Sequence, residues 1–258
     1  MPPLRLSHEI FPHLPDVKAN HKAGLTNPYH TKILEEDPNN QFLILGSELR
    51  EVAGHLRTWF QKKGEQNEGS QPQHHRLVVE VGCHYGHVLT QMAADHPNCY
   101  FLGLDITLKR VYQSAKKIKQ QALHNAGVAY FNAHHLPHLF ACHEIDCLVI
   151  FFPDPWHKKT KQQKHRLIQE RFIRNLAPLL APQGEIWFKT DCEHYFHSVD
   201  QLLLVHGFQT KQQSWLAEIH HHKKKQPYVS LFEQRFQELG QPIYEKIYSP
   251  PKSHQSIK

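Results

Sequence analysis

The sequence contains little that would place the protein in a membrane or outside the cell. No apolar run approaches the ~20 residues that a membrane-spanning helix needs. The opening MPPLRLSHEIFPHLP is interrupted by prolines where a signal peptide would carry an apolar stretch. The 5 cysteines are an odd number and never form CxxC, which is typical of free thiols in a reducing compartment rather than of disulfides or a zinc site. We therefore predict a cytoplasmic protein that holds no metal and does not associate with membranes.

The composition supports a folded domain and favours an anionic partner. The chain has 258 residues, of which 40% are hydrophobic, enough to bury a sizeable core. Lys and Arg total 30 against 24 Asp and Glu, a formal net charge of +6, and the 24 histidines add positive charge as the pH falls toward ~6.5. A basic balance favours nucleic acid over a membrane surface as partner, although charge alone identifies no ligand.

The amino-terminal part of the chain differs in pattern from the rest. Residues 1–40 are rich in Pro, His and Asn with little periodicity, which predicts an irregular or partly disordered arm. Residues 41–63 space their apolar side chains three and four apart and predict an amphipathic helix, and the polar residues 64–75 resemble a linker. We therefore predict an amino-terminal arm over 1–75 and one folded domain over 76–258.

Strands and helices alternate from residue 76 onward. Short apolar or β-branched runs predict strands at 77–81, 100–105, 128–133, 145–152 and 184–191. Segments with helical spacing predict helices at 87–96, 108–125, 165–181 and 193–207. Such alternation is typical of βαβ units, so we expect an α/β fold with a mostly parallel, twisted sheet and helices on both of its faces. In this architecture ligands bind at the carboxyl ends of the strands.

The first predicted strand ends in EVGCHYG, with Glu80 ahead of Gly82 and Gly86. Glycines between a strand and a helix let the backbone approach a ligand closely, although many such turns are plain connections. A carboxylate ahead of the first glycine would repel a phosphate and attract an amino group or a sulfonium. Glu80 therefore favours a cationic ligand.

Polar residues also end the next two predicted strands. Asp105 lies roughly 20 residues past the glycine turn, where a carboxylate can accept hydrogen bonds from ribose hydroxyls. An N-cap of the following helix is an equal alternative for Asp105, and Asn132 can either bond the edge of a purine ring or form a turn. Together with Glu80 and the two glycines, these residues predict a site for an adenosine with a positively charged tail. S-adenosyl-L-methionine fits that description better than NAD, whose G-x-G-x-x-G turn has no preceding acid.

The segment FFPDPWHKK (151–159) ends the fourth predicted strand with an acid held between two prolines. Pro153 and Pro155 restrict the backbone on both sides of Asp154 and so fix its carboxylate at the ligand-binding edge of the sheet. Trp156 offers a ring that can stack on a base. A solvated charge run is the alternative for the cations that follow, but a run that begins at this edge favours contact with a polyanion. Its basic side chains are Lys158, Lys159, Lys161, Lys164 and Arg166, with His157 and His165.

Several of these segments resemble those of one enzyme family. FFPDPWHKK with its basic continuation, the E-x-G…G turn, the L-G-x-D strand end, KTD at 189–191 and LFEQRFQELGQPIYE at 231–245 follow the order and spacing of tRNA (guanine-N7)-methyltransferases. The resemblance covers residues 76–248. It implies a Rossmann-like class I fold that transfers a methyl group from S-adenosyl-L-methionine to N7 of a guanine in tRNA, at position 46 of the variable loop. It also implies tRNA as the partner of a monomer or homodimer.

The resemblance, which agrees with the residue pattern, implies roles for individual residues. Asp154 would be the catalytic residue and would also line the cofactor site. The other cofactor-binding residues would be Glu80, Gly82, Gly86, Asp105 and Asn132. The substrate guanosine would be contacted by Lys158, Asp191, Ser230, Leu231, Phe232 and Glu233. The rest of the RNA would be contacted by Trp156, Lys159, Thr160, Lys161, Lys164, His165 and Arg166.

Three positions depart from the family pattern, and one of them is Asn132, where some relatives carry Asp. His84 stands where the family's turn has a middle glycine, and Leu231 replaces a lysine in the family's T-K-F-E, which is SLFE here. These departures leave open a non-catalytic RNA-binding protein that keeps the methyltransferase fold. Neighbouring histidines, as at 220–222, suggest a metal-binding protein, but adjacent histidines seldom point at one ion. Thermal stabilisation by S-adenosylhomocysteine, NAD or zinc would separate these alternatives.

Overall fold

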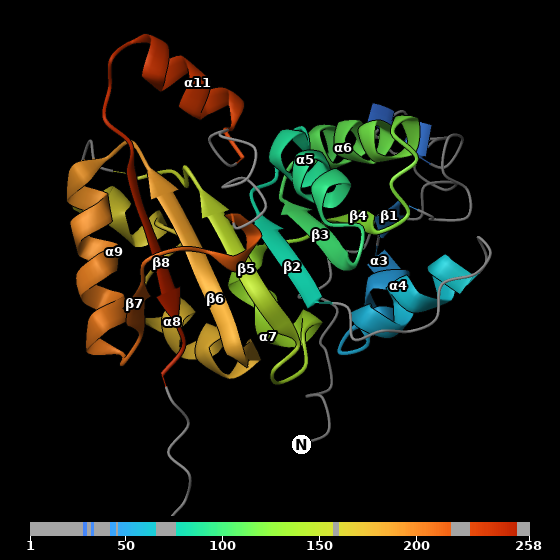
Figure 1. Cartoon of the computed structure of the whole chain (residues 1–258), viewed down its shortest axis with the longest axis horizontal. Coiled ribbons are helices and arrows are strands. Elements are labelled where there is room, and N and C mark those ends of the chain that lie inside the picture. Colours follow the sequence, from blue (N-terminus) through green and yellow to red (C-terminus); the bar gives the residue numbers. More distant parts are fainter. Residues whose placement is uncertain are drawn as a thin grey trace, which may run out of the picture. The chain divides into compact units, whose positions relative to one another are not determined.

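The computed structural model describes residues 28–29, 32–33, 42–44, 46–65, 76–156, 160–217 and 228–251. The chain divides into two compact units, Met1–Ala141 and Cys142–Lys258, each built from strands and helices (Figure 1). Among the described residues, no helix is both long and apolar enough to cross a bilayer. The division into an arm over 1–75 and a domain over 76–258 stays a prediction.

The strands described in the first unit are parallel and follow the order β1-β4-β3-β2. They are β1 (Leu43–Ile44), β2 (Arg76–Val81), β3 (Cys99–Asp105) and β4 (Ala126–Tyr130). β3 is buried along its whole length, as expected for a parallel strand covered on both faces. The register pairs Glu80 with Gly103 and Asp105 with Tyr130, so the ends of β2, β3 and β4 share one edge.

Helices cover both faces of these strands. On one face, the Phe60 ring stacks on Tyr100 of β3 with 4.9 Å between centroids. The helices α5 and α6 lie on the other face (Figure 1). A Cβ at Gly103 would come within 2.8 Å of Cys83 Sγ and of Leu89 Cδ2, so glycine is required for the turn after β2 to pack against β3. Besides short helical stretches at 28–29 and 32–33, the described helices of this unit are α3 (Gly46–Val52), α4 (Leu56–Glu65), α5 (His87–Asp95), α6 (Leu108–Gln120) and α7 (Leu136–Leu139), with the 3-10 helix η1 (Ala133–His135).

The single helix predicted over residues 41–63 is wrong. Leu43 and Ile44 form β1 against β4, and two helices, α3 and α4, follow it. The break between these helices lies at Gly54, whose φ is +73° and whose N–H donates to the Leu139 carbonyl at 2.8 Å. Strand pairing and this tertiary hydrogen bond outweigh the helical spacing of the apolar residues. Part of the predicted arm therefore contributes a strand to the first unit.

The strands described in the second unit follow the order β5-β6-β8-β7. β5 and β6 are parallel, whereas β8 runs antiparallel to both β6 and β7. The strands are β5 (Ile145–Phe151), β6 (Leu180–Thr190), β7 (Gln209–Lys211) and β8 (Tyr244–Ser249). The described helices are α8 (Glu170–Leu176), α9 (Glu193–Val205) and α11 (Leu231–Glu238), with the 3-10 helices η2 (Thr160–His165), η3 (Ala177–Leu179) and η4 (Trp215–Ala217). The prediction of an α/β fold with mostly parallel strands is confirmed, and the antiparallel β8 adds to it.

The helix predicted over residues 165–181 is shorter than expected. α8 is a compact helix that ends at Leu176, and Leu180 already pairs with Ile145 in the sheet. Pro178 lies between them and lacks the N–H that would continue a helical hydrogen-bond ladder. β6 accordingly begins before the strand predicted at 184–191.

Candidate active site

Two glycines with left-handed backbone shape the turn after β2. Gly82 has a φ of +74° and Gly86 a φ of +66°, values that residues with a side chain rarely adopt. The N–H groups of Gly82 and Cys83 both donate to the Leu104 carbonyl, at 2.7 and 3.1 Å, and tie the turn to the end of β3. A Cβ on Gly82 would meet nothing within 4 Å, so the backbone there borders open space that a ligand can fill.

His84 adopts the same left-handed conformation and is held in it by two side chains. Its φ is +51°, a strained value that costs about 1–3 kcal/mol in a residue other than glycine. Its N–H donates to Asp105 Oδ2 at 3.1 Å, and its carbonyl accepts from Ser114 Oγ at 2.9 Å. Burial, followed by the Arg110 cation, lowers the pKa of His84, so its imidazole is neutral near pH 7. The histidine is therefore accommodated without placing a positive charge in the turn.

Glu80 is a buried carboxyl that lacks a hydrogen-bond donor for one of its oxygens. The residue is 5% exposed, and its Oε2 has no partner among the described residues. Burial raises the pKa of Glu80 to about 8; a backbone hydrogen bond from Leu89 opposes the rise, Asp105 adds to it and Lys117 opposes it. A buried acceptor in this state is costly until a donor arrives. A ligand with a cationic N–H group would satisfy it.

Asp105 uses both carboxylate oxygens to hold the turn. Oδ2 accepts from His84 N–H, and Oδ1 accepts from Thr107 N–H at 2.8 Å. Arg110 Nη1 lies 3.8 Å from Oδ2, and the Asp105 side chain is 2% exposed. The N-cap residue of α6 is Thr107, so the N-cap alternative for Asp105 is wrong; its carboxylate instead bonds the backbone of the turn and of the residues that lead into α6. Each oxygen keeps a further lone pair, so a ribose contact is compatible with this role.

Asn132 forms a turn through its side-chain oxygen. It is exposed, and its Oδ1 accepts from the His134 N–H at 3.0 Å, which caps η1. The turn-forming alternative therefore accounts for the oxygen. The predicted purine contact would use the side-chain NH2 group, and it stays a prediction.

Asp154 lies in a turn with left-handed residues on either side. Phe152 has a φ of +52° and Trp156 a φ of +42°, while Asp154 itself is exposed. The Phe152 N–H donates to the Lys189 carbonyl at 2.8 Å, which extends the pairing of β5 with β6 into the turn. The exposed carboxylate of Asp154 is therefore carried by a restrained backbone, in agreement with the prolines that flank it.

Part of the basic segment after this turn lies outside the described residues. Lys158 and Lys159 fall there, and Thr160 and Lys161 are described by their backbone alone, at the start of η2. The predicted contact of Lys158 with guanosine, and those of the other three residues with RNA, stay predictions.

The described end of the basic segment contains two kinds of side chain. Lys164 and His165 are exposed, and the His165 ring lies 5.5 Å from the Trp156 ring, centroid to centroid. Arg166 is 7% exposed, and its Nε donates to the Pro155 carbonyl at 2.7 Å. Exposure therefore separates Arg166 from its neighbours, although the sequence gives all of them the same predicted contact with RNA.

A buried ion pair joins β6 to α11. Lys189 is 2% exposed, and its Nζ lies 3.2 Å from both carboxylate oxygens of Glu233, which is 5% exposed. The same Nζ lies 4.8 Å from the centroid of the Phe151 ring. Burial raises the pKa of Glu233, and the Lys189 cation opposes the rise. The carboxylate predicted to contact guanosine is thus held by a lysine of the sheet.

Lys189 is absent from the site residues predicted above. Its signal in the sequence is a lysine inside the apolar strand GEIWFKTD, where a buried cation needs a partner. The sequence does not identify that partner, because Glu233 lies 44 positions away.

Some of the other residues predicted to contact guanosine have exposed side chains, and others have side chains that already bond within the protein. Leu231 and Phe232 are 48% and 46% exposed at the start of α11, and Asp191 is partly exposed directly after β6. Ser230 is buried and caps α11, with its Oγ accepting from the Glu233 N–H at 3.1 Å. Ser230 and Glu233 therefore have structural partners of their own, whereas the other three can be reached from outside.

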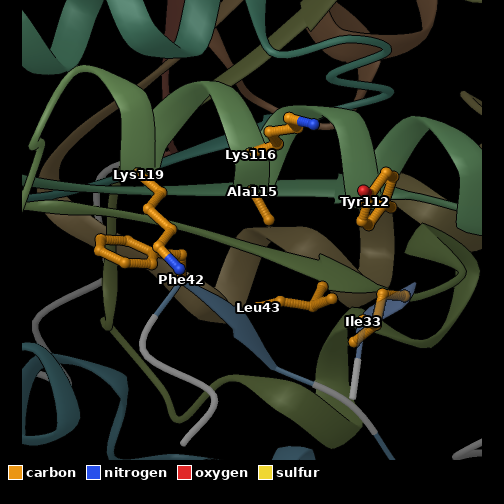
Figure 2. Close-up of a pocket in the computed structure, with 7 residues that line it drawn as sticks. All are labelled: Ile33, Phe42, Leu43, Tyr112, Ala115, Lys116 and Lys119. Carbon is orange, nitrogen blue, oxygen red and sulfur yellow. The ribbon is translucent and has the colours of Figure 1, made fainter. Parts of the chain in front are cut away.

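A pocket beside α6 does not match the requirements of a cationic ligand. Its lining is mostly apolar, and its charged side chains are two lysines rather than acids (Figure 2). Like charges would repel a sulfonium or an ammonium group there. The lining residues are Ile33, Phe42, Leu43, Tyr112, Ala115, Lys116 and Lys119.

Comparison with known proteins identifies the family. A family model described as "Putative methyltransferase" matches residues 74–246. The tRNA (guanine-N(7)-)-methyltransferase of Streptococcus mutans is 31% identical over 211 residues, which are 82% of this chain and 92% of that protein. The chain belongs to the tRNA (guanine-N(7)-)-methyltransferase family. A relative from Alkaliphilus metalliredigens with the same description is 32% identical over 67% of this methyltransferase and 81% of its own length. The resemblance drawn from the motifs is confirmed.

This methyltransferase also resembles solved structures of much lower sequence identity. One described as "Structure of an Antibiotic Related Methyltransferase" is 17% identical, with a TM-score of 0.44 over 67% of this chain and 84% of that chain. The fold assignment accordingly rests on the strand order and pairing described above and on the family.

The first unit of this methyltransferase fits the cofactor that the family uses, S-adenosyl-L-methionine. The unpartnered Oε2 of buried Glu80 can accept a hydrogen bond from the cofactor's ammonium group. The open space at Gly82 admits a ligand against the backbone, and Asp105 keeps lone pairs for ribose hydroxyls. S-adenosyl-L-methionine is therefore confirmed as the cofactor of the family, and the individual contacts stay predictions.

Proposed function

We propose that this methyltransferase transfers the methyl group of S-adenosyl-L-methionine to N7 of a guanine in tRNA, and that its target is position 46 of the variable loop. The match across 92% of a relative named for guanine-N7 methylation of tRNA carries the proposal. The buried, unpartnered acid beside a glycine turn supports it, because such an acid suits a cationic donor. We further propose that the chain acts in the cytoplasm, as a monomer or a homodimer.

The chemistry of the target atom defines the task of the protein. Guanine N7 has an exposed lone pair in the plane of the ring, so no base is needed to activate it. The bound cofactor supplies an electrophilic methyl group on a sulfonium. The main contribution of the protein is then to hold the guanine so that N7 is aligned with the methyl group, an effect worth up to ~7–11 kcal/mol in ideal intramolecular cases.

Carboxylates provide the remaining contribution. Asp154 and Asp191 accept hydrogen bonds from N–H groups of the guanine and stabilise the positive charge that the ring acquires. Asp154 acts in this proposal as an orienting and electrostatic group and removes no proton. Glu80 and Asp105 hold the amino group and the ribose of the cofactor.

Transfer of a labelled methyl group tests the proposal. Unmodified tRNA is incubated with the enzyme and labelled S-adenosyl-L-methionine, and the product is cleaved chemically at N7-methylguanosine. Cleavage at position 46, absent from a transcript with adenine there, supports both parts of the proposal. Cleavage at another guanine contradicts the position. Binding of tRNA without any transfer would favour the non-catalytic alternative.

The raised pKa of Glu80 predicts that cofactor binding is coupled to proton release. Its pKa of about 8 leaves the unliganded carboxyl mostly protonated at pH 7, and the ammonium group of S-adenosylhomocysteine favours the ionised form. We expect close to one proton to be released at pH 7, and affinity to rise about fivefold between pH 7 and 8 and about tenfold in total before it levels off above pH 8. Calorimetry in buffers of different ionisation enthalpy counts the protons.

The Glu80→Gln variant is the matched control for this titration. It should release no proton, and its affinity should be flat across the same pH range, because burial lowers the pKa of His84 and His87 and leaves both neutral there. The raised pKa of Glu80 also determines how the stability of the folded state changes with pH. The folded state binds this proton more tightly than the unfolded state, so unliganded stability should fall as pH rises from 4.5 through about 8. Equal proton release by wild type and Glu80→Gln would contradict the assignment.

We predict that Lys164 makes a salt-dependent contact with RNA. It is exposed on η2 in the basic segment. Replacement by alanine should weaken tRNA binding and reduce the slope of log affinity against log salt by about 0.7–0.9, the value for one neutralised phosphate. Filter binding over a range of salt concentrations measures the slope. Lys62→Ala, at an exposed position on α4, is the control and should leave the slope unchanged.

A further inference from the structure

Arg166 differs from the exposed cations that precede it. Lys164 and His165 face solvent, whereas Arg166 is 7% exposed. Its Nε donates to the Pro155 carbonyl at 2.7 Å, and its guanidinium carbon lies 4.8 Å from the centroid of the Tyr195 ring. A guanidinium with these contacts is fixed in place, and it would have to leave them to reach a phosphate in solvent.

The carbonyl that Arg166 holds belongs to the turn that carries Asp154. Pro155 directly follows Asp154, and Phe152 and Trp156 on either side have left-handed backbone. Residues in such conformations persist where the surrounding structure holds them. A hydrogen bond from a charged donor is about twice as strong as a neutral one, so Arg166 is well suited to hold this turn.

The environment of Arg166 is itself braced. The Gln169 side chain donates to the carbonyls of Lys164 and Arg166, each at 2.7 Å, and ties the end of η2 to the start of α8. The Tyr195 hydroxyl accepts from the Ile168 N–H at 3.3 Å. Burial raises the pKa of Tyr195 to about 12, with Arg166 opposing the rise and Asp154 adding to it, so both charges act on the same ring.

One nitrogen of Arg166 indicates that packing alone does not explain this residue. Its Nη2 is buried and has no acceptor among the described residues. An unpartnered buried donor costs about 1–3 kcal/mol, a penalty that an apolar side chain of similar size would avoid. The contact that sets arginine apart from such a side chain is the hydrogen bond to Pro155.

We infer that Arg166 is a positioning residue for Asp154, which it serves by holding the Pro155 carbonyl, and that it does not contact RNA. This replaces the contact with RNA predicted from the sequence. The inference rests on the proposed function, because it assigns Arg166 a role in methyl transfer. It also links the two ends of the segment, since the residue that follows η2 fixes the turn that precedes it.

Steady-state kinetics of three variants test the inference. Arg166→Met keeps the apolar stem and removes the donor, and it should lower kcat roughly 10- to 100-fold, in line with the loss of one charged hydrogen bond. Its KM for tRNA and its salt slope should match those of the wild type. Arg166→Lys should recover part of kcat, because its ammonium group can donate to the Pro155 carbonyl. Lys164→Ala should show the opposite pattern. Its KM for tRNA and its salt slope should change, and its kcat should not.

A double-mutant cycle with Asp154 shows whether Arg166 acts through that residue. In the Asp154→Asn background, Arg166→Met should lower kcat by less than about threefold further, because coupled sites are not additive. Arg174→Met, which removes an exposed cation on α8 and leaves the Pro155 contact, is the control and should leave kcat near wild type. If Arg166→Met does not fold, Arg166→Lys takes its place in the cycle with a smaller expected effect.

The outcomes separate the inference from the proposed function. A wild-type enzyme that transfers no methyl group to tRNA overturns the proposed function. With an active wild type, the inference alone is overturned if Arg166→Met raises KM and lowers the salt slope as Lys164→Ala does. It is also overturned if Arg166→Met lowers kcat by the same factor with Asp154 present and with Asp154 replaced.

Discussion

Replacing Asp154 with asparagine is expected to lower kcat by roughly 100- to 1,000-fold, the loss found when one electrostatic group facing the transition state is removed. The amide has nearly the same size but carries no charge, so it cannot stabilise the cationic ring. It also presents an NH2 group where the guanine requires an acceptor. The KM for tRNA should change little, because phosphate contacts dominate affinity. Single-turnover transfer of labelled methyl to tRNA measures the effect.

A second carboxylate of the same unit provides the control for Asp154. Glu238 is the exposed last residue of α11 and is not among the residues predicted to form the site, and Glu238→Gln removes the same charge as Asp154→Asn. Its kcat should remain close to that of the wild type. Near-normal turnover by Asp154→Asn, with an unchanged pH profile, would show that Asp154 neither orients the base nor stabilises its charge.

Replacing Lys189 with methionine is expected to destabilise the protein by about 3–5 kcal/mol, the cost of leaving one partner of a buried ion pair uncompensated. Glu233 would then be a buried carboxylate without its cation, since both of its oxygens lie 3.2 Å from Lys189 Nζ. Chemical denaturation gives the free energy of unfolding. The deficit should shrink as pH is lowered, because the pKa of Glu233 is already raised by burial and the folded variant can bind the proton.

Two further variants show whether burial is the cause. Adding Glu233→Gln to Lys189→Met removes the uncompensated charge and should restore much of the lost stability. Arg174→Met breaks an ion pair with Glu170 on α8 whose side chains are 68% and 58% exposed, and it should cost less than about 1 kcal/mol. If Lys189→Met and Arg174→Met lower the free energy of unfolding by similar amounts, burial of the ion pair is not the cause.

The sequence predicts the parallel strands of the fold well, because such strands are buried on both faces and appear as continuous apolar runs. The positions of Glu80, Asp105 and Asp154 follow directly, since each lies within the last two residues of one of these strands or shortly after it. The prediction over residues 41–63 is wrong for a physical reason. Helical spacing is a local property, and the pairing of Leu43 with Val128 in β4 is a distant one.

The side chains that support the site were much harder to predict. Lys164, His165 and Arg166 look equivalent in a basic run, and the burial of Arg166 depends on a carbonyl and a ring that lie elsewhere in the sequence. The Lys189–Glu233 pair likewise depends on how α11 meets β6. The sequence shows which residues are charged, but which of these residues are buried depends on the fold.

The strand order of the second unit also bears on synthesis at the ribosome. β8 lies between β6 and β7, although β7 is made first, and among the described residues β7 pairs with β8. The sheet therefore cannot close until residues 244–249 emerge from the exit tunnel. Until then β6, with Trp187 and Phe188, keeps one unpaired edge, the kind of surface that invites aggregation. We expect the nascent chain to need protection at this strand until β8 has been made.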